Sequence, residues 1–189
     1  RSGRALHVGF NRRHSEAVRQ ARAHLGAGPR VVDYRVSTGA LPEGHWYHDL
    51  RQGGRLVGEG CHFIDTASAL VGAPVVACST FGAAGPEHEV LLADDLVLTL
   101  QHADGSVSSI SMASGGAPGE AKEHVEVRSG GRTAVVEDFR SLVLDGRRRR
   151  LPRPDRKGHA AMLRAVERAV VAVDHGPLHR PQHRRVALA

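Results

Sequence analysis

A cluster of polar side chains with helical spacing lies in the segment 53–65, which reads Gly-Gly-Arg-Leu-Val-Gly-Glu-Gly-Cys-His-Phe-Ile-Asp. Glu59, His62 and Asp65 recur every three residues, so on a helix their side chains share one face, while apolar neighbours turn towards a core. A histidine flanked by carboxylates has a pKa adjustable across neutrality and neighbours that orient its ring, as a general acid or base requires. The spacing therefore favours acid–base chemistry at His62, and a surface histidine in weak ion pairs is the alternative.

Metal binding is the less favoured chemistry for these residue types. Cys61 and His62 are adjacent, so their side chains point about 100° apart on a helix, and no CxxC or HExxH spacing accompanies them. His175, His179 and His183 are spaced by four, but the prolines between them preclude a helix that would align them. We therefore expect a structural Cys61 and no metal site.

The first half of the chain has the pattern of helix, strand, loop and helix. Ser15 is suited to cap a helix whose apolar positions recur at spacings of three and four up to Gly26. Over 31–37 the period changes to two, which predicts a strand. Residues 38–55 carry neither period and form a long loop in this interpretation, a kind of loop that is often functional. Helical spacing returns over 56–71.

Beyond Pro74, strands and turns replace the helical pattern. Asp104-Gly105 predicts a hairpin turn, and Arg147 to Arg150 would form a solvated edge strand whose charge opposes aggregation. Successive strands are expected to be antiparallel neighbours, which gives an α+β fold: a predominantly antiparallel sheet of five or six strands with helices on one face. The strand-like segments from which these five or six strands would come are 75–81, 96–100, 107–112, 125–127, 133–136, 142–144 and 147–151, and a last helix runs from Met162 to Val173.

Composition excludes several classes of protein. With 41% hydrophobic residues in a chain of 189, there is enough apolar surface for one globular domain. No run approaches the roughly 18 apolar residues of a membrane span, and neither a signal peptide nor a disulfide framework is present, which favours a reducing cytoplasm. The net charge of +6 leaves nucleic acid open, but the 4% aromatic content and the absence of zinc-finger spacing disfavour it. We expect neither a membrane nor a nucleic-acid partner.

Five segments, in this order, carry a more specific pattern: Gly9-Phe10-Asn11-Arg12-Arg13, His45-Trp46, Gly53 to Asp65, Val136-Glu137-Asp138-Phe139-Arg140 and Asp155-Arg156-Lys157-Gly158-His159. Together they resemble the second domain of the Gfo/Idh/MocA oxidoreductases, the relatives of glucose-fructose oxidoreductase and inositol dehydrogenase. The run 58–65 is especially similar to a subgroup often fused behind an alcohol-dehydrogenase-like domain. The resemblance spans nearly the whole chain.

The resemblance implies an N-terminal Rossmann domain that binds NAD or NADP, followed by a domain like this one. No Gly-x-Gly-x-x-Gly follows a strand here, and the chain opens Arg1-Ser2-Gly3, so we expect a fragment of a longer protein. Residues 1–14 would be the linker from the missing domain, 15–176 the substrate and oligomerisation domain, and 177–189 a C-terminal tail. The lysine of the family's Glu-Lys-Pro motif would also lie upstream.

The resemblance also implies roles for individual residues. His62 corresponds to the histidine of the family's Asp-x-x-x-His motif, whereas the aspartate position is Gly58. Glu59 is the candidate substitute, although a shift by one residue turns its side chain by about 100°. The expected substrate contacts come from His45, Trp46, Asp65 and Arg13, and the expected cofactor contact from Arg12. The alternatives are an aromatic residue that packs the loop onto the body, and arginines in a solvated linker.

Two functions remain open at this point. The first is the substrate domain of an NAD(P)-dependent oxidoreductase that acts on a sugar, cyclitol or related polyol, with His62 exchanging the hydroxyl proton. The second is a non-catalytic interaction or dimerisation module that retains an enzyme-like helix. Leu96, Leu98 and Leu100 alternate with Val97 and Thr99, so both sheet faces are largely apolar and a homodimer through one sheet face is expected.

Overall fold

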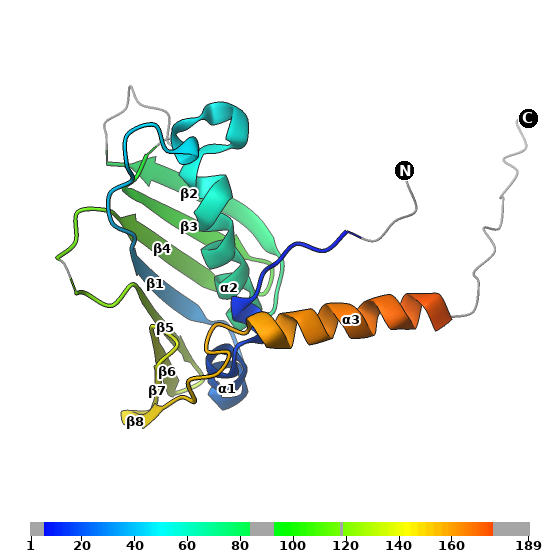
Figure 1. Ribbon diagram of the computed structural model, residues 1–189. Coiled ribbons are helices and arrows are strands. Elements are labelled where there is room, and N and C mark those ends of the chain that lie inside the picture. Colours follow the sequence, from blue (N-terminus) through cyan, green and yellow to red (C-terminus); the bar gives the residue numbers. More distant parts are fainter. Residues whose placement is uncertain (1–5, 84–92, 118, 176–189) are drawn as a thin grey trace, which may run out of the picture.

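The computed structural model describes residues 6–83, 93–117 and 119–175, which form an open eight-stranded sheet with three helices (Figure 1). The helices are α1 (Glu16–His24), α2 (Cys61–Val71) and α3 (His159–His175). The strands are β1 (Val31–Ser37), β2 (Val75–Gly82), β3 (Leu96–His102), β4 (Val107–Ala113), β5 (Glu123–Ser129), β6 (Arg132–Glu137), β7 (Ser141–Leu144) and β8 (Arg147–Arg150). The expected C-terminal tail, with His179 and His183, lies outside the described residues.

The strand order confirms the α+β class and corrects its details. The order is β2-β3-β4-β1-β5-β6-β7-β8, so the first strand of the chain lies in the middle of the sheet. β1 runs parallel to β4, with Val31 opposite Val107, and every other neighbouring pair is antiparallel. The expected predominance of antiparallel pairs is therefore confirmed, whereas the expected count of five or six strands was too low. Periodicity shows that a strand exists, but it does not show which distant strand pairs with it.

One face of the sheet forms the core. Val32, Tyr34 and Val36 of β1 are buried there, and their neighbours on β3, β4 and β5 are buried on the same side. Helix α2 packs on β1 and β4, and α1 packs on β6 and β7, so both helices cover this face (Figure 1). The side chain of Ser15 accepts a hydrogen bond from the amide of Val18, which confirms the expected helix cap.

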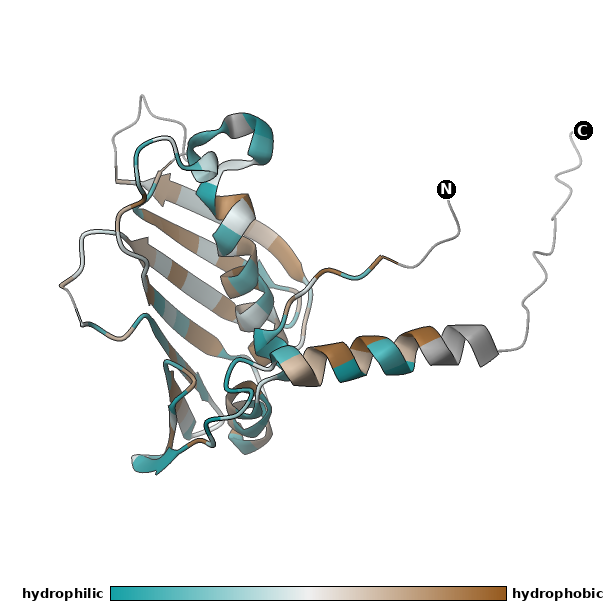
Figure 2. Ribbon diagram, viewed as in Figure 1, coloured by the Kyte–Doolittle hydropathy of each residue, from teal (hydrophilic) through white to brown (hydrophobic). Residues whose placement is uncertain are grey.

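The opposite face of the sheet is uncovered within the described chain. Phe81 on β2 and Val97 on β3 are 74% and 45% exposed. Charged side chains such as Asp33 and Arg128 lie on the same face, towards β1 and β5, and the exposed Val31 and Val107 lie there too, so the face combines apolar and charged residues. All four residues of β8 are exposed at the other edge, which confirms the expected charged edge strand (Figure 2).

The second helix is not a continuous α-helix. Residues Leu56–Gly60 form a π-helical turn, and regular α2 begins only at Cys61. It ends at Gly72, whose φ of +86° is the left-handed conformation that suits a glycine C-cap. Because a π turn holds more residues than an α turn, side chains before Gly60 do not keep the angular positions that α-helical spacing predicts.

No helix among the described residues is long and apolar enough to cross a membrane.

Helix α3 extends away from the sheet (Figure 1). Its start is held by the loop before it, where both carboxylate oxygens of Asp155 accept hydrogen bonds from the amides of Ala160 and Ala161. Gly158 (φ +80°) lies so close to Asn11 that a Cβ would approach its carbonyl oxygen to 2.5 Å. This close approach joins the C-terminal helix to the beginning of the described chain.

Candidate functional site

His62 lies in the first turn of α2, directly after the π turn. Its ring meets Phe10 edge-on, with a centroid distance of 5.7 Å, and its backbone carbonyl accepts a hydrogen bond from Thr66 Oγ1 at 2.7 Å. The Nδ1 atom is buried and has no hydrogen-bond partner in the part of the chain that the structure describes. Because the chain covers Nδ1, the other ring nitrogen, Nε2, is the one suited to exchange a proton with a bound ligand.

The environment keeps the His62 ring neutral. Burial lowers the pKa of His62 below its usual value of 6.5, and the positive charge of Arg12 lowers it further. The carboxylates of Asp65, Glu123 and Glu59 oppose this shift without reversing it. At neutral pH the imidazole is therefore a proton acceptor, the state that a general base requires.

Asp65 and Arg13, two of the expected substrate contacts, form an ion pair with each other. Arg13 Nε donates to Asp65 Oδ2 at 2.9 Å, and Arg13 Nη2 donates to Oδ1. The aspartate side chain is buried, whereas that of Arg13 is 44% exposed. Asp65 thus has its charge balanced within the fold, while part of the Arg13 guanidinium reaches solvent. Their contact with a substrate stays a prediction.

Glu59 forms ion pairs with two cations. Lys122 Nζ lies 2.8 Å from Glu59 Oε1, and Arg55 Nε lies 3.5 Å from Oε2. No hydrogen bond joins Glu59 to His62 among the described residues. The shared-face argument for Glu59 assumed regular α-helical spacing, and the π turn at Leu56–Gly60 removes that premise. A catalytic role for Glu59 stays a prediction, now without direct contact between the pair.

The space beside Gly58, the position that the resemblance assigns to the family's aspartate, is filled by an aromatic ring. Tyr47 donates its hydroxyl hydrogen bond to the carbonyl oxygen of Gly58 at 3.1 Å. A Cβ at Gly58 would collide with this ring, whose Cδ1 atom would be only 2.6 Å away. Gly58 is therefore required by close packing, and Tyr47 joins the 38–55 loop to the π turn before His62. Burial and the charge of Glu59 raise the Tyr47 pKa.

Tyr47 also brings His45 and Trp46 to the same end of α2. His45 caps the short helical turn Trp46–His48, where its Nδ1 accepts the amide of Tyr47 at 3.2 Å. Trp46 is 52% exposed and packs on Tyr47, with a centroid distance of 4.2 Å. Tyr47 therefore attaches the loop to the body and leaves Trp46 at the surface. Substrate contact by His45 and Trp46 stays a prediction.

Arg12 is not part of a solvated linker, so that alternative was wrong. The residue is only 8% exposed, and its Nε and Nη2 donate to the two oxygens of Glu123 at 2.7 and 2.9 Å. Lys157 Nζ and the Tyr34 hydroxyl bind the same carboxylate. Glu123 is fully buried; burial alone would raise its pKa, but the hydrogen bonds and charges of Arg12 and Lys157 lower it to about 2. Contact between Arg12 and a cofactor stays a prediction. Two of the three guanidinium nitrogens of Arg12 already donate to Glu123.

Sequence reasoning missed Glu123, Tyr47 and the wholly buried Arg55. Arg55 Nη1 lies 2.9 Å from Asp94 Oδ1, and its Nη2 donates to the carbonyl of Gly39. A signal for Glu123 was present: it shares the inward face of β5 with Val125 and Val127, and a carboxylate on a buried face needs a partner. The signal for Tyr47 was weaker, because the loop has no period.

The cysteines and metal ligands offer little further chemistry. Cys61 is half-buried, Cys78 is exposed, and both are free thiols; burial raises the pKa of Cys61, so its reactive thiolate is disfavoured. In residues 6–83, 93–117 and 119–175, no group of three or more histidine, cysteine or acidic side chains is arranged to hold a metal ion.

The family assignment follows from the central part of the chain. Residues 18–134, which run from α1 to β6, match the model of the GFO/IDH/MocA C-terminal domain. The chain belongs to this family of oxidoreductase C-terminal domains. No curated protein is significantly similar to it in sequence.

Solved structures share the fold over nearly the whole chain. An oxidoreductase from Thermotoga maritima is 17% identical with a TM-score of 0.68, covering 92% of this chain and 54% of its own. The aldose-aldose oxidoreductase from Caulobacter crescentus, complexed with glycerol, has the same identity and TM-score, with 90% and 55% covered. The WlbA dehydrogenase from Bordetella pertussis, in complex with NADH and UDP-GlcNAcA, is 19% identical with a TM-score of 0.61, covering 86% and 52%. The chain therefore spans about half the length of these relatives.

Proposed function

We propose that this chain supplies the substrate-binding and oligomerisation surface of an NAD(P)-dependent oxidoreductase that acts on a hydroxyl of a sugar, cyclitol or related polyol. The observation that carries the proposal is His62: a half-buried, neutral imidazole within the segment that matches the family model, at the position that the resemblance assigns to the family's histidine. Relatives whose structures contain NADH with a sugar nucleotide, or glycerol, are consistent with this substrate class.

The chain's residues divide the work in the following way. His62 accepts the proton of the substrate hydroxyl as that group is oxidised, and Thr66 holds the backbone of the same helical turn. Arg13, fixed by Asp65, offers its exposed nitrogen to a substrate oxygen. His45 and Trp46 border the substrate from the loop that Tyr47 attaches. The nicotinamide, when bound, accepts the hydride.

The cofactor belongs mainly to another domain in this proposal. The Arg12 guanidinium is largely committed to Glu123, and the described chain presents no glycine-rich turn at a helix N-terminus to hold a pyrophosphate. We therefore expect the 189-residue chain to fold but to bind neither NAD(H) nor NADP(H) tightly. Calorimetry of the purified chain checks this, and micromolar binding of either dinucleotide would contradict it.

The decisive test begins with the sequence that precedes Arg1. A Gly-x-Gly-x-x-Gly after a strand, together with a Glu-Lys-Pro, would support the oxidoreductase. In the longer protein, His62→Ala should then lower hydride transfer to a nicotinamide about 10²-fold or more, whereas His159→Ala, at an exposed position of α3, should not. Equal rates for both variants would make His62 structural.

A second candidate function rests on one observation. Tyr47 occupies the space of the family's aspartate, so the Asp-x-x-x-His pair is absent from this helix. This favours a non-catalytic dimerisation module with an inherited enzyme-like helix. If the longer protein forms a dimer but oxidises no polyol or sugar, that result would support this second function over the first.

A further inference from the structure

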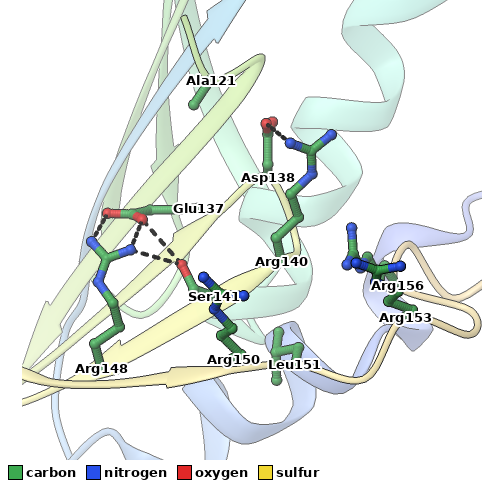
Figure 3. A pocket seen from close by; sticks show the side chains of 10 residues that line it. All are labelled: Ala121, Glu137, Asp138, Arg140, Ser141, Arg148, Arg150, Leu151, Arg153 and Arg156. Atoms are coloured by element: carbon green, nitrogen blue, oxygen red, sulfur yellow. Dashed lines mark hydrogen bonds and ion pairs between the residues drawn. The ribbon is translucent and has the colours of Figure 1, made fainter.

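A cavity rich in arginine lies at the β6–β8 edge of the sheet, outside the site described above. Its volume is about 500 Å³, and its walls are the ends of β6, β7 and β8 and the loop that follows β8 (Figure 3). The lining residues include five arginines and only two carboxylates, those of Glu137 and Asp138. The arginines are Arg140, Arg148, Arg150, Arg153 and Arg156.

The carboxylates neutralise only part of this charge. Arg148 binds both oxygens of Glu137, at 2.5 and 2.9 Å, and shares its Nη1 with Ser141 Oγ (Figure 3). Arg140 Nη1 lies 3.9 Å from Asp138 Oδ2, which is too far for a hydrogen bond and makes this a weak ion pair. Within the described chain, no carboxylate comes within 4.0 Å of the guanidinium groups of Arg150, Arg153 or Arg156. Three positive charges are therefore left to solvent or to a ligand.

Arg156, which lines the same cavity, is partly enclosed by the chain around it. Its Nε is buried and has no hydrogen-bond partner among the described residues. A bound anion would therefore meet the outer Nη1 and Nη2 groups of Arg156, which can pair with two oxygens of a phosphate at once. Several guanidinium groups on one concave wall also repel each other, and a bound anion would offset this repulsion.

We propose that this cavity binds the phosphate or diphosphate group of a small phosphorylated molecule. Three unpaired guanidinium groups call for an anion with more than one charge, which a phosphate monoester or diphosphate supplies and a single carboxylate does not. The volume is that of a small-molecule pocket. No aromatic side chain lines the cavity to stack a base, so it lacks the platform that binds single-stranded nucleic acid. The site is independent of the function proposed for His62.

The turn beside the cavity explains how Arg140 is positioned. Asp138 and Phe139 have φ values of 48° and 56°, a conformation that residues other than glycine rarely adopt, and Arg140 donates its amide to the Glu137 carbonyl. The turn is held because Phe139 is fully buried and Asp138 Oδ1 accepts the amide of Glu123. The core thus fixes the backbone of Arg140 at the cavity wall, and its side chain remains largely exposed.

The test is a calorimetric titration of inorganic pyrophosphate into the purified chain at low salt. We expect one saturable site with a dissociation constant of about 1 mM or tighter, which weakens as salt is added. Arg153→Gln/Arg156→Gln should weaken binding about tenfold or more, because each lost guanidinium removes charge-assisted hydrogen bonds. The matched control is Arg19→Gln/Arg128→Gln, which removes two charges elsewhere on the surface and should leave the affinity within about twofold.

Three results would overturn the proposal. One is the absence of saturable pyrophosphate binding, and another is equal weakening by both double variants, which would indicate general attraction to a basic protein. The third is tighter binding of a single-stranded oligonucleotide than of pyrophosphate, with an affinity that increases with the length of the oligonucleotide. If Arg153→Gln/Arg156→Gln lowers the melting temperature, Arg150→Gln on the exposed strand β8 replaces it, and it too must weaken pyrophosphate binding.

Discussion

At the scale of single residues, the state of His62 makes a prediction about pH. Burial and Arg12 hold its folded pKa below 6.5, and a base must be unprotonated to accept the hydroxyl proton. In the longer protein, kcat/KM for alcohol oxidation should therefore be flat near neutrality and fall as pH drops through that lowered pKa. Because the Asp65 carboxylate raises the His62 pKa, Asp65→Asn should move this acidic limb to lower pH.

The control for this shift is Asp33→Asn, which removes an equal charge from the open face of the sheet. Its pH profile should coincide with that of the unaltered protein. An acidic limb that Asp65→Asn leaves in place would mean that a group other than His62 titrates.

Glu123 predicts how the fold responds to acid. Its pKa in the folded chain is about 2, against a usual value of 4.5, so ionised Glu123 stabilises the fold above pH 4.5 and this contribution is lost as pH falls towards 2. The loss amounts to about 3 kcal/mol of unfolding free energy. Urea unfolding across this range measures it.

The matched variants are Glu123→Gln and Glu126→Gln, two positions on opposite faces of β5. Glu123→Gln leaves Arg12 and Lys157 without their counter-charge and should cost about 3–5 kcal/mol at pH 7. Glu126→Gln should cost less than about 1 kcal/mol, because its ion pair with Arg128 is partly exposed. Equal costs would show that the buried network adds nothing to stability.

At the scale of elements, the π turn predicts a compensating pair of substitutions. Gly58→Asp, which introduces the residue expected there from the resemblance, should destabilise the fold by about 1–3 kcal/mol because its Cβ collides with the Tyr47 ring. In a protein that already carries Tyr47→Ala the ring is gone, so adding Gly58→Asp should cost much less stability than it does in the unaltered protein. Thermal unfolding of the four variants in a cycle gives the coupling. Gly115→Asp, where a Cβ meets nothing within 4 Å, is the control, and additive effects at 58 and 47 would refute the steric account.

Local patterns predicted most of the elements, and the particular failures have physical reasons. The Ser15 cap and the Asp104-Gly105 turn depend on neighbouring residues only, and both are present. The turn at Asp138 and Phe139 was missed because it contains no glycine, and burial of the Phe139 side chain determines its conformation. In the site, the resemblance to the family pointed to His62. Tyr47 was missed because its contact with Gly58 follows no periodic pattern in the sequence.

At the scale of the whole molecule, the open sheet face predicts a homodimer. Phe81 and Val97 are exposed at its β2 side, while Asp33 and Arg35 on β1 and Glu126 and Arg128 on β5 provide charges of both signs that a two-fold partner could pair. Sedimentation at micromolar concentration should give a dimer, and Val97→Asp should dissociate it by burying an unpaired charge.

The control is Leu163→Asp, an equally polar change at a 62% exposed position of α3, which should leave the dimer intact. A single species near 20.2 kDa for the unaltered chain would refute the dimer. A dimer that survives Val97→Asp would place the interface elsewhere.

The central position of β1 has a consequence for how the chain reaches its fold. The contact that begins the β1–β4 pairing joins Arg30 to Ser106, 76 residues apart, and the Arg12–Glu123 pair spans 111. Forming such contacts requires closing long loops, which slows folding relative to domains built from local contacts. During synthesis, both edges of β1 remain unpaired until β4 and then β5 leave the ribosome. While residues 38–129 are synthesised, β1 therefore exposes at least one unpaired edge on which aggregation can begin.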